Sequence, residues 1–150
     1  MWPSIIAVVG TLLGGALTGL LQIKSTRIAQ SAARADQKAE ALRRALGELV
    51  AALGDHRRAM WHREALRLDG AGDEAVEAAR KASHATRSAV TGPLVAVSVL
   101  ESSLAEPARQ AALAAFNLRN ATSRDVLASR REAAIAATDA LVAAAGRAMT

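Results

Sequence analysis

The sequence predicts an all-α protein in which an N-terminal transmembrane helix continues into a cytoplasmic, antiparallel bundle of about four helices. Three observations predict this fold class. Residues 2–23 contain no charged side chain, alanine makes up about a quarter of the 150 residues, and aromatic residues make up only 2%. Alanine is the strongest helix former, and few β-branched or aromatic residues remain outside the first segment to build a sheet.

The uncharged N-terminal run is long enough to cross a membrane. A helix rises about 1.5 Å per residue, so residues 2–23 would extend roughly 33 Å, against a bilayer core of about 30 Å. A cleaved secretory signal would need a basic start and a shorter apolar core, and a buried core helix is the less favoured interpretation because the run is apolar on all sides. We therefore predict a transmembrane anchor over residues 1–23.

The residues after the anchor predict its orientation. Residues 24–40 are expected to form a basic, partly solvated connector helix, because positive charges outnumber negative ones there. Basic flanks stay on the cytoplasmic side, so we predict a single-pass protein of the cell membrane with its N-terminus outside and its C-terminal domain in the cytoplasm. The basic side chains expected to contact lipid headgroups are Lys24, Arg27, Arg34 and Lys38.

Glycines within the anchor predict lateral association in the membrane. Gly10 and Gly14 are four residues apart, and so are Gly15 and Gly19. Small residues at this spacing let two helix backbones approach closely. The sequence therefore indicates two kinds of partner so far, membrane lipid and another copy of the chain.

Residues 41–150 are expected to form the helical bundle. The clearest stripe in this region has apolar spacings of four and three, which are typical of a helix packed along its length on another helix. Its members are Leu42, Leu46, Leu49, Leu53, His56 and Met60. The connector carries a thinner stripe of Ile28, Ala32, Ala35 and Ala39.

Turn signals separate the expected helices. Gly70 and Gly72 permit positive φ, and Asp73 is a natural N-cap for a second helix from about 74 to 100. Pro93 is expected either to kink or to break that helix.

Two further helices complete the expected bundle. Ser103 and Glu106 resemble a capping box for a third helix over about 105–119. The fourth is expected to run from Arg124 to about Ala148. The apolar side chains expected to pack are Leu113, Phe116 and Leu118 in the third helix, and Leu127, Ala134, Leu141, Ala145 and Met149 in the fourth.

Two charged residues fall within the apolar stripe of the first helix and predict a polar layer. By helical spacing Arg57 and Glu64 lie near its middle, and a buried charge needs a partner. Folding the first two helices as a hairpin around residues 70–71 would bring Arg80 to Glu64 and Arg87 to Arg57. We therefore predict a Glu64–Arg80 ion pair and a polar layer that holds Arg57 and fixes the helix register.

The sequence argues against enzymatic or cofactor chemistry. Cysteine is absent, and His56 and His62 are six residues apart, so they would point in different directions on a helix. No phosphate-binding loop or nucleophile elbow is present. We therefore expect no enzyme activity, no metal and no cofactor.

A contact surface for a partner is predicted at Arg58, Trp61 and His62. Nucleic acid is the less favoured partner, because acidic residues interleave with the arginines and mixed signs are typical of a solvated helix face. Two other functions stay open beside a non-enzymatic interaction role. One is a holin-like, membrane-perturbing small protein, and the other is a membrane-tethered DNA-binding protein.

Three segments together resemble a known family. They are Met1–Gly14, then Asp55–Trp61 followed by Arg63 and Glu64, and His84–Ala89 with Pro93 and Leu94. In this order they are similar to the KilB-type kill or spread proteins of conjugative plasmids and integrative elements in high-GC filamentous bacteria. The resemblance implies a role in plasmid transfer and intercompartment spread, together with toxicity when expression is unchecked. It implies other plasmid-transfer or membrane proteins as partners, and no catalytic residues.

Overall fold

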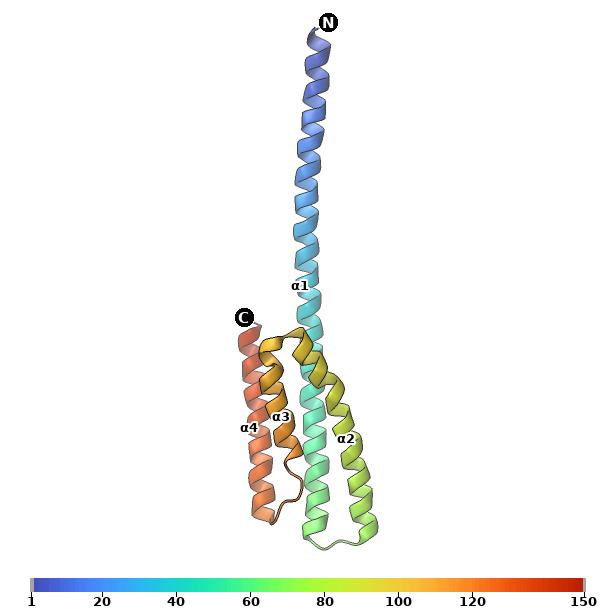
Figure 1. The fold of residues 1–150 in the computed structure, drawn as a ribbon, viewed down its shortest axis with the longest axis vertical. Helices are drawn as coiled ribbons and strands as arrows, with labels where there is room; N and C mark the ends of the chain where they lie inside the picture. Colours follow the sequence, from blue (N-terminus) through green and yellow to red (C-terminus); the bar gives the residue numbers. More distant parts are fainter. Residues whose placement is uncertain (1, 150) are drawn as a thin grey trace. The chain divides into compact units, whose positions relative to one another are not determined.

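A computed structural model describes the backbone of residues 2–149 and the side chains of residues 30–149. Over this range the chain is all-α, as the sequence predicts, and it contains no strand (Figure 1). The chain divides between Lys38 and Ala39 into an N-terminal and a C-terminal unit. Its elements are α1 (Trp2–Leu68), α2 (Asp73–Leu100), the short 3-10 helix η1 (Ser102–Leu104), α3 (Ala105–Phe116) and α4 (Arg124–Ala148).

The N-terminal unit is the first part of α1, and residues 30–38 are all exposed, including Arg34 and Lys38. The other expected features of this unit lie outside the residues whose side chains are described. They are the anchor over residues 1–23 with Gly10, Gly14, Gly15 and Gly19, and the two basic residues Lys24 and Arg27. No helix of the described residues is long and apolar enough to cross a membrane.

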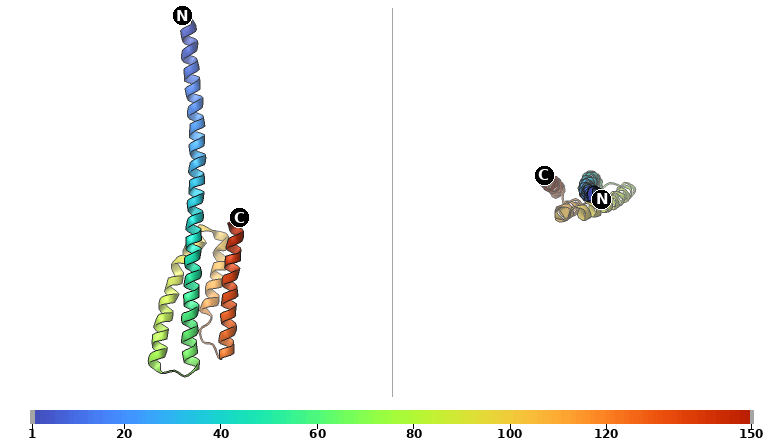
Figure 2. Two further views of the ribbon diagram at one scale, coloured as in Figure 1. Left: turned by 180° about the vertical axis from the view of Figure 1, so that it is seen from behind. Right: turned by 90° about the horizontal axis from the view of Figure 1, so that it is seen from above.

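The C-terminal unit is an antiparallel bundle, as predicted. Its consecutive helices run in opposite directions, and residues 39–68 of α1 lie between α2 on one side and the α3–α4 pair on the other (Figures 1 and 2). The predicted stripe of α1 is buried at all six positions from Leu42 to Met60. The stripe therefore provides the centre of the core.

Most of the core consists of leucine and valine against alanine. The main cluster combines leucines of α1 with Val90 and Val97 of α2, Leu104 of η1, and Leu141 of α4. The buried face of α3 consists of alanine alone, at Ala108, Ala111, Ala112 and Ala115. A second cluster near the α3–α4 loop contains Met60, Leu118, Ala121, Leu127 and Ala134.

Two residues expected in the core are exposed instead. Leu113 is 40% exposed because the buried alanines of α3 occupy a different face of the helix. Met149 is 44% exposed because it follows the last residue of α4. Phe116, also expected to pack, is half-buried at the end of α3.

The turn between α1 and α2 forms where predicted, with one correction at the helix start. Gly70 has a φ of 70°, a conformation that glycine adopts without a steric penalty. The N-cap is Gly72 and not Asp73, which is the first helical residue. The Asp73 carboxylate still lies in the first turn, where it favourably meets the positive end of the helix dipole. Helix α2 continues through Pro93 without a break.

The start and end of α3 differ from the prediction. The expected capping box of Ser103 and Glu106 is wrong, because the short η1 helix precedes α3 and the Glu101 carboxylate accepts from Ser103 at 2.7 Å instead. Helix α3 ends at Phe116 and not near residue 119, and Asn120 has a positive φ of 58°. Helix α4 begins at Arg124 as expected, with the Ser123 hydroxyl accepting from the Val126 amide at 3.2 Å.

Candidate functional site

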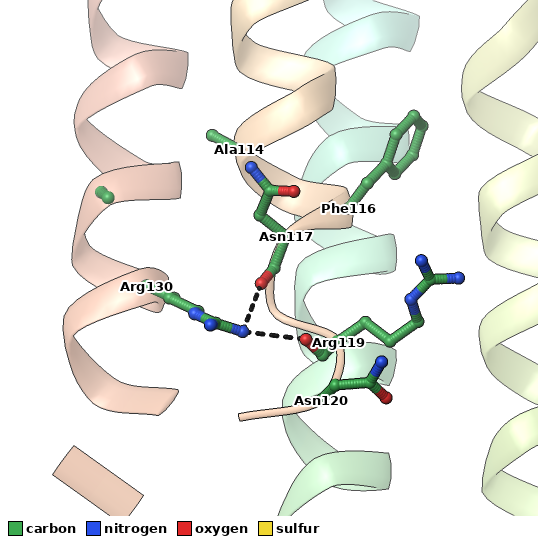
Figure 3. Close-up of a pocket in the computed structure, with 7 residues that line it drawn as sticks. Ala114, Phe116, Asn117, Arg119, Asn120 and Arg130 are labelled. Atoms are coloured by element: carbon green, nitrogen blue, oxygen red, sulfur yellow. Dashed lines mark hydrogen bonds between the residues drawn. The ribbon is translucent and has the colours of Figure 1, made fainter. Parts of the chain in front are cut away.

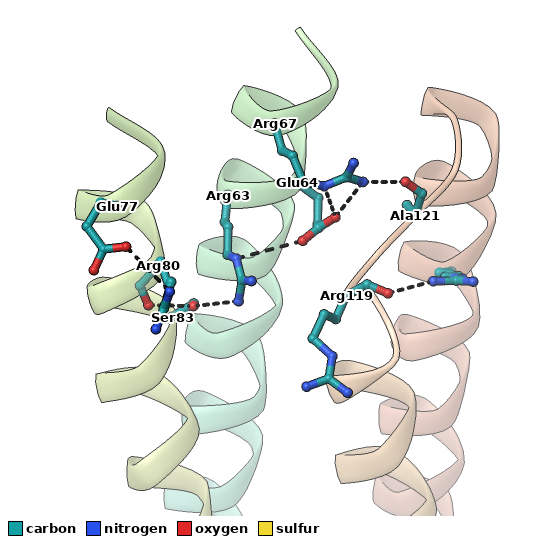
Figure 4. Close-up of polar contacts among 9 residues, drawn as sticks. Arg63, Glu64, Arg67, Glu77, Arg80, Ser83, Arg119 and Ala121 are labelled. Atoms are coloured by element: carbon teal, nitrogen blue, oxygen red, sulfur yellow. Dashed lines mark hydrogen bonds and ion pairs between the residues drawn. The ribbon is translucent and has the colours of Figure 1, made fainter. Parts of the chain in front are cut away.

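One buried carboxylate organises the polar contacts between the helices of the bundle (Figure 4). Glu64 on α1 is fully buried, as its place in the apolar stripe predicts. Its Oε2 lies 2.8 Å from Arg67 Nη2 and accepts from Arg67 Nε at 2.9 Å, while its Oε1 lies 3.8 Å from Arg63 Nε. Arg67 also donates to the backbone carbonyl of Ala121. This arginine therefore both neutralises Glu64 and ties α1 to the α3–α4 loop.

The predicted Glu64–Arg80 pair is wrong. Residues 39–68 of α1 are packed on both sides, and Glu64 pairs with Arg67, whose guanidinium donates to the Ala121 carbonyl of the α3–α4 loop. Arg80 is instead exposed and lies 3.7 Å from Glu77 on its own helix. The predicted pairing of residues along α1 and α2 is close to the observed one, with Arg63 opposite Ser83 and His56 opposite Thr86. The prediction that Glu64 faces α2 is wrong.

One polar link between α1 and α2 is made by Arg63 and not by the predicted Arg57. Arg63 Nη1 donates to Ser83 Oγ at 3.4 Å, and Ser83 is itself buried and donates to the carbonyl of Arg80 at 2.7 Å. Arg57, which was expected to occupy this layer, is half-buried and makes no ion pair with the described residues. Arg87 is exposed, and its guanidinium carbon lies 4.1 Å from the centre of the Phe116 ring.

His56 is a second buried polar residue, 1% exposed, at the junction of α1, α2 and α3. Its Nδ1 lies 3.0 Å from Thr86 Oγ1, and that hydroxyl is also placed to donate to the carbonyls of Ala82 and Ser83. We therefore assign the ring proton to Nδ1, which donates to Thr86. The imidazole meets the Phe116 ring edge-on, with centroids 5.2 Å apart.

The surroundings of His56 favour its neutral form. Burial and then the charge of Arg87 lower the pKa of His56 to about 4, partly offset by a hydrogen bond with the Ser83 backbone. The second ring nitrogen, Nε2, is buried without a hydrogen-bond partner among the described residues. A neutral ring tolerates this position, whereas a proton there would be a buried and unpaired charge.

Acidification is expected to destabilise the bundle through His56. The pKa of this group is 6.5 in the unfolded chain and about 4 in the folded one. As the pH falls from 6.5 towards 4, the unfolded chain takes up a proton that the folded chain does not, so the free energy of unfolding falls by up to about 3 kcal/mol. Urea unfolding of the full chain in mild detergent can measure this, with Trp61 fluorescence recorded in a Trp2→Phe background that leaves one tryptophan.

Two histidine variants separate this effect from general acid sensitivity. His56→Leu should lose less stability than the parent chain over the same pH range, because it has no proton to take up there. His84→Gln, at an exposed position, should retain the parent pH dependence. Equal pH slopes for His56→Leu and the parent would contradict the assignment.

The predicted contact residues Arg58, Trp61 and His62 lie on one exposed side of α1, but they differ in availability. Arg58 is exposed and pairs with Asp55 on the same helix, and His62 is exposed. Trp61 is half-buried: it packs against the second core cluster, and the Arg131 guanidinium from α4 lies 5.3 Å from its ring centre. The indole is therefore shared between the core and the surface.

A pocket of about 460 Å³ lies beside the end of α3 (Figure 3). Arg130 of α4 points into it, and its Nη1 donates to the carbonyls of Asn117 at 3.0 Å and Arg119 at 2.8 Å. These bonds satisfy carbonyl groups at the C-terminal end of α3, so Arg130 stabilises the loop. The remaining lining residues are Ala114, Phe116, Asn120 and Ala133.

The structure describes the side chains of residues 30–149. Among them, no three His, Cys, Asp or Glu side chains are grouped so that they could hold a metal ion. Sequence reasoning missed the Arg67–Ala121 bond and the His56–Thr86–Phe116 contacts. The three-residue spacing of Glu64 and Arg67 was an available signal for their ion pair, whereas the contacts to Ala121, Thr86 and Phe116 depend on chain segments 30 or more residues away.

Comparisons with known proteins agree with one another. Residues 43–149 match the model of a family described as the KilB plasmid transfer protein. The chain is also 54% identical over 147 residues to Protein KilB of Streptomyces lividans, covering 98% of this chain and 97% of that protein. No solved structure matches the chain.

Proposed function

Because this chain belongs to the KilB family of plasmid transfer proteins, we propose that it acts in plasmid transfer and spread as a membrane-anchored, non-enzymatic interaction protein. The observation that carries this proposal is the 54% identity with the Streptomyces lividans protein over nearly the whole of both chains. The similarity extends beyond the bundle matched by the family model. It therefore includes most of the uncharged N-terminal run as well.

The proposed anchor is residues 1–23, with the N-terminus outside and the bundle in the cytoplasm. An uncharged run of 22 residues at positions 2–23 has the length that a bilayer core requires. The basic residues after it favour the cytoplasmic side and the headgroups of anionic lipid. An anchor of this kind would hold the bundle at the cytoplasmic face of the membrane.

The proposed work of the bundle is to bind other plasmid-transfer or membrane proteins. Arg58 and His62 are exposed on α1 and the half-buried Trp61 lies beside them, so this side offers charge and an aromatic surface together. Arginine and tryptophan are enriched where protein partners bind most tightly. Buried groups such as Glu64 and His56 are committed to contacts within the bundle, which leaves this surface as the proposed place of recognition.

A transfer experiment tests the anchor and the bundle separately. Cells carrying a plasmid deleted for its own copy would receive the full chain, the fragment 24–150, or the full chain with Arg58→Ala and His62→Ala. We expect the full chain in the membrane fraction with spread restored, and the fragment in the soluble fraction with spread lost. The double alanine variant should stay in the membrane but spread plasmid poorly.

The same strains distinguish the proposal from the two other functions. A full chain that is found unprocessed in the soluble fraction would contradict the anchor. Dye leakage that is lost when Gly10, Gly14, Gly15 and Gly19 are changed to leucine would favour a membrane-perturbing protein. DNA binding by the fragment that falls steeply as salt is raised would favour a DNA-binding protein.

A further inference from the structure

The pocket beside the end of α3 presents hydrogen-bond donors and positive charge to solvent. Its volume of about 460 Å³ lies within the roughly 300–1,000 Å³ that is typical of ligand sites. Arginine and asparagine supply its polar lining, at Asn117, Arg119, Asn120 and Arg130, and no Asp or Glu among the described residues lines it. A guanidinium donates and never accepts, and the amide NH2 of asparagine also donates. The pocket therefore suits an anionic group that accepts hydrogen bonds.

The way in which α3 ends places these side chains together. The helix ends at Phe116, and the turn that follows includes Asn120 at a positive φ of 58°, a conformation that asparagine tolerates better than most residues. Arg130 holds this turn by donating to the Asn117 and Arg119 carbonyls at 3.0 and 2.8 Å, so its own guanidinium is committed to the backbone. Arg119 is exposed, and its side chain extends to the same side of α3 as the Phe116 ring, toward α2 (Figure 3). Arg119 is therefore the charge of the pocket that is left for a ligand.

Helix α2 adds a second arginine at the same ring. Arg87 is exposed, and its guanidinium carbon lies 4.1 Å from the centre of the Phe116 ring, which also lines the pocket. A guanidinium stacked on an aromatic ring is attracted to it, and its planar donors are kept in a fixed orientation. Such a group loses less conformational entropy when it binds a planar carboxylate. Two arginines from separate elements therefore border one pocket.

Neither of these two arginines is neutralised within the described part of the chain. Eight other arginines of the bundle form an ion pair with an Asp or Glu of the same chain. Among the described residues, Arg87 and Arg119 form none. Arg44 and Arg57 also form none there, but neither takes part in the pocket or in the contact with the Phe116 ring. Arg87 and Arg119 are therefore available to an anion from outside the chain.

We propose that Arg87 and Arg119 bind an acidic segment of a protein partner, whose Asp or Glu carboxylates accept from the two guanidinium groups and from asparagine amides of the pocket. A carboxylate accepts two parallel hydrogen bonds from one guanidinium, and this pairing is stronger than one between neutral groups. Arginine clusters are a recurrent means of recognising acidic motifs. The inference goes beyond the proposed function, since it depends neither on the anchor nor on the surface at Arg58 and His62.

Charge and size favour a short acidic segment over nucleic acid as the occupant. Residues 39–150 carry 15 Lys and Arg against 13 Asp and Glu, so the bundle lacks the excess of positive charge that an extended polyanion requires. Two unpaired arginines neutralise about two phosphates, whereas proteins that bind DNA tightly make roughly 6–10 such contacts. A short segment needs only the local charge at the pocket, and successive carboxylates on one peptide match two arginines on separate elements.

Binding of a hexaglutamate peptide to the full chain tests the site. The peptide carries an uncharged fluorophore, and its anisotropy is followed as protein in neutral detergent is added at about 20 mM salt, where charge screening is weak. Arg119→Gln and Arg87→Gln should each raise the Kd about three- to five-fold, as expected for the loss of one exposed ion pair. Arg109→Gln is the matched control, because it removes an exposed arginine of α3 that already pairs with Glu106 at 2.7 Å. This control should change the Kd by less than about two-fold.

Each outcome of this titration supports or overturns the site. Absence of peptide binding overturns it, and so does an equal loss with Arg109→Gln, which would indicate general attraction between charges. A hexathymidylate probe that binds more tightly than the peptide would replace the protein partner by nucleic acid. Urea unfolding shows whether Arg87→Gln, which loses the contact with Phe116, remains folded; if it does not, Arg119→Gln alone decides, and an unchanged Kd for that variant overturns the proposal. A full chain found in the soluble fraction would contradict the anchor but not this site.

Discussion

Replacing Arg67 by alanine is expected to lower the free energy of unfolding by about 3 kcal/mol. The substitution removes the closest cation from Glu64, which is fully buried, and leaves Arg63 at 3.8 Å as its remaining charged neighbour. It also removes the hydrogen bond to the Ala121 carbonyl that ties α1 to the α3–α4 loop. Urea unfolding followed by Trp61 fluorescence in the Trp2→Phe background measures the change.

Arg58→Ala is the matched control for this prediction. Arg58 is also an arginine on α1 with a carboxylate three residues before it, but the side chains of Arg58 and Asp55 are 73% and 56% exposed. An exposed pair of this kind contributes about 0.5 kcal/mol or less. Adding Glu64→Leu to Arg67→Ala should recover part of the lost stability, because no charge is then left buried without its partner. Equal stability of the two single alanine variants would contradict the role given to Glu64.

Leu49→Ala is expected to destabilise the bundle by about 3 kcal/mol, within the roughly 2–5 kcal/mol observed for leucine truncation in packed cores. Leu49 is 0% exposed and belongs to the main cluster, where α1 meets α2, α3 and α4. The alanines of α3 in the same cluster are too short to fill the space that the leucine side chain would vacate. The same unfolding measurement reports the loss.

Leu113→Ala tests whether burial, and not the loss of a leucine as such, sets the size of that effect. Leu113 is 40% exposed on α3, so its truncation should cost less than about 1 kcal/mol. A similar cost for both leucines would mean that Leu113 packs more tightly than its exposure indicates. It would also support the prediction from sequence that Leu113 is a core residue.

The helices were largely predictable because their signals are local. Spacings of four and three residues mark the buried stripe of α1, and all six members from Leu42 to Met60 are buried. Gly70 marks the turn, and Ser123 marks the start of α4 through its own side-chain bond. Each of these signals acts within about one helical turn, so no knowledge of the packing was needed to find them.

Partners of the polar residues were less predictable, as Glu64 shows. Its position in the stripe correctly predicts burial, but two neighbouring surfaces were available to receive the carboxylate. Facing α2 would favour Arg80, whereas facing the α3–α4 loop favours Arg67, which can reach both Glu64 and the Ala121 carbonyl. A rotation of α1 by a fraction of a turn separates these arrangements, and helical spacing does not determine it.

Alanine causes a similar ambiguity on α3. Because small apolar residues occupy several faces of this helix, hydrophobicity favours Leu113 as a packing residue, yet the buried face is formed by four alanines. Close approach of α3 to α1 and α4 requires the smaller side chains at the contact. The choice of face is therefore made by the fit between helices and not by the most apolar residue.

Sequence alone determined the helical class, the limits of most helices and the buried line of α1, because these follow from backbone propensity and from a periodicity carried by neighbouring residues. Only the tertiary structure decided that Arg67 neutralises Glu64, that His56 meets Thr86 and Phe116, and that α3 packs through alanine. These contacts join segments tens of residues apart, and each depends on the rotation of one helix against another. That rotation minimises the packing energy of all the helices together, so no single stretch of sequence contains it.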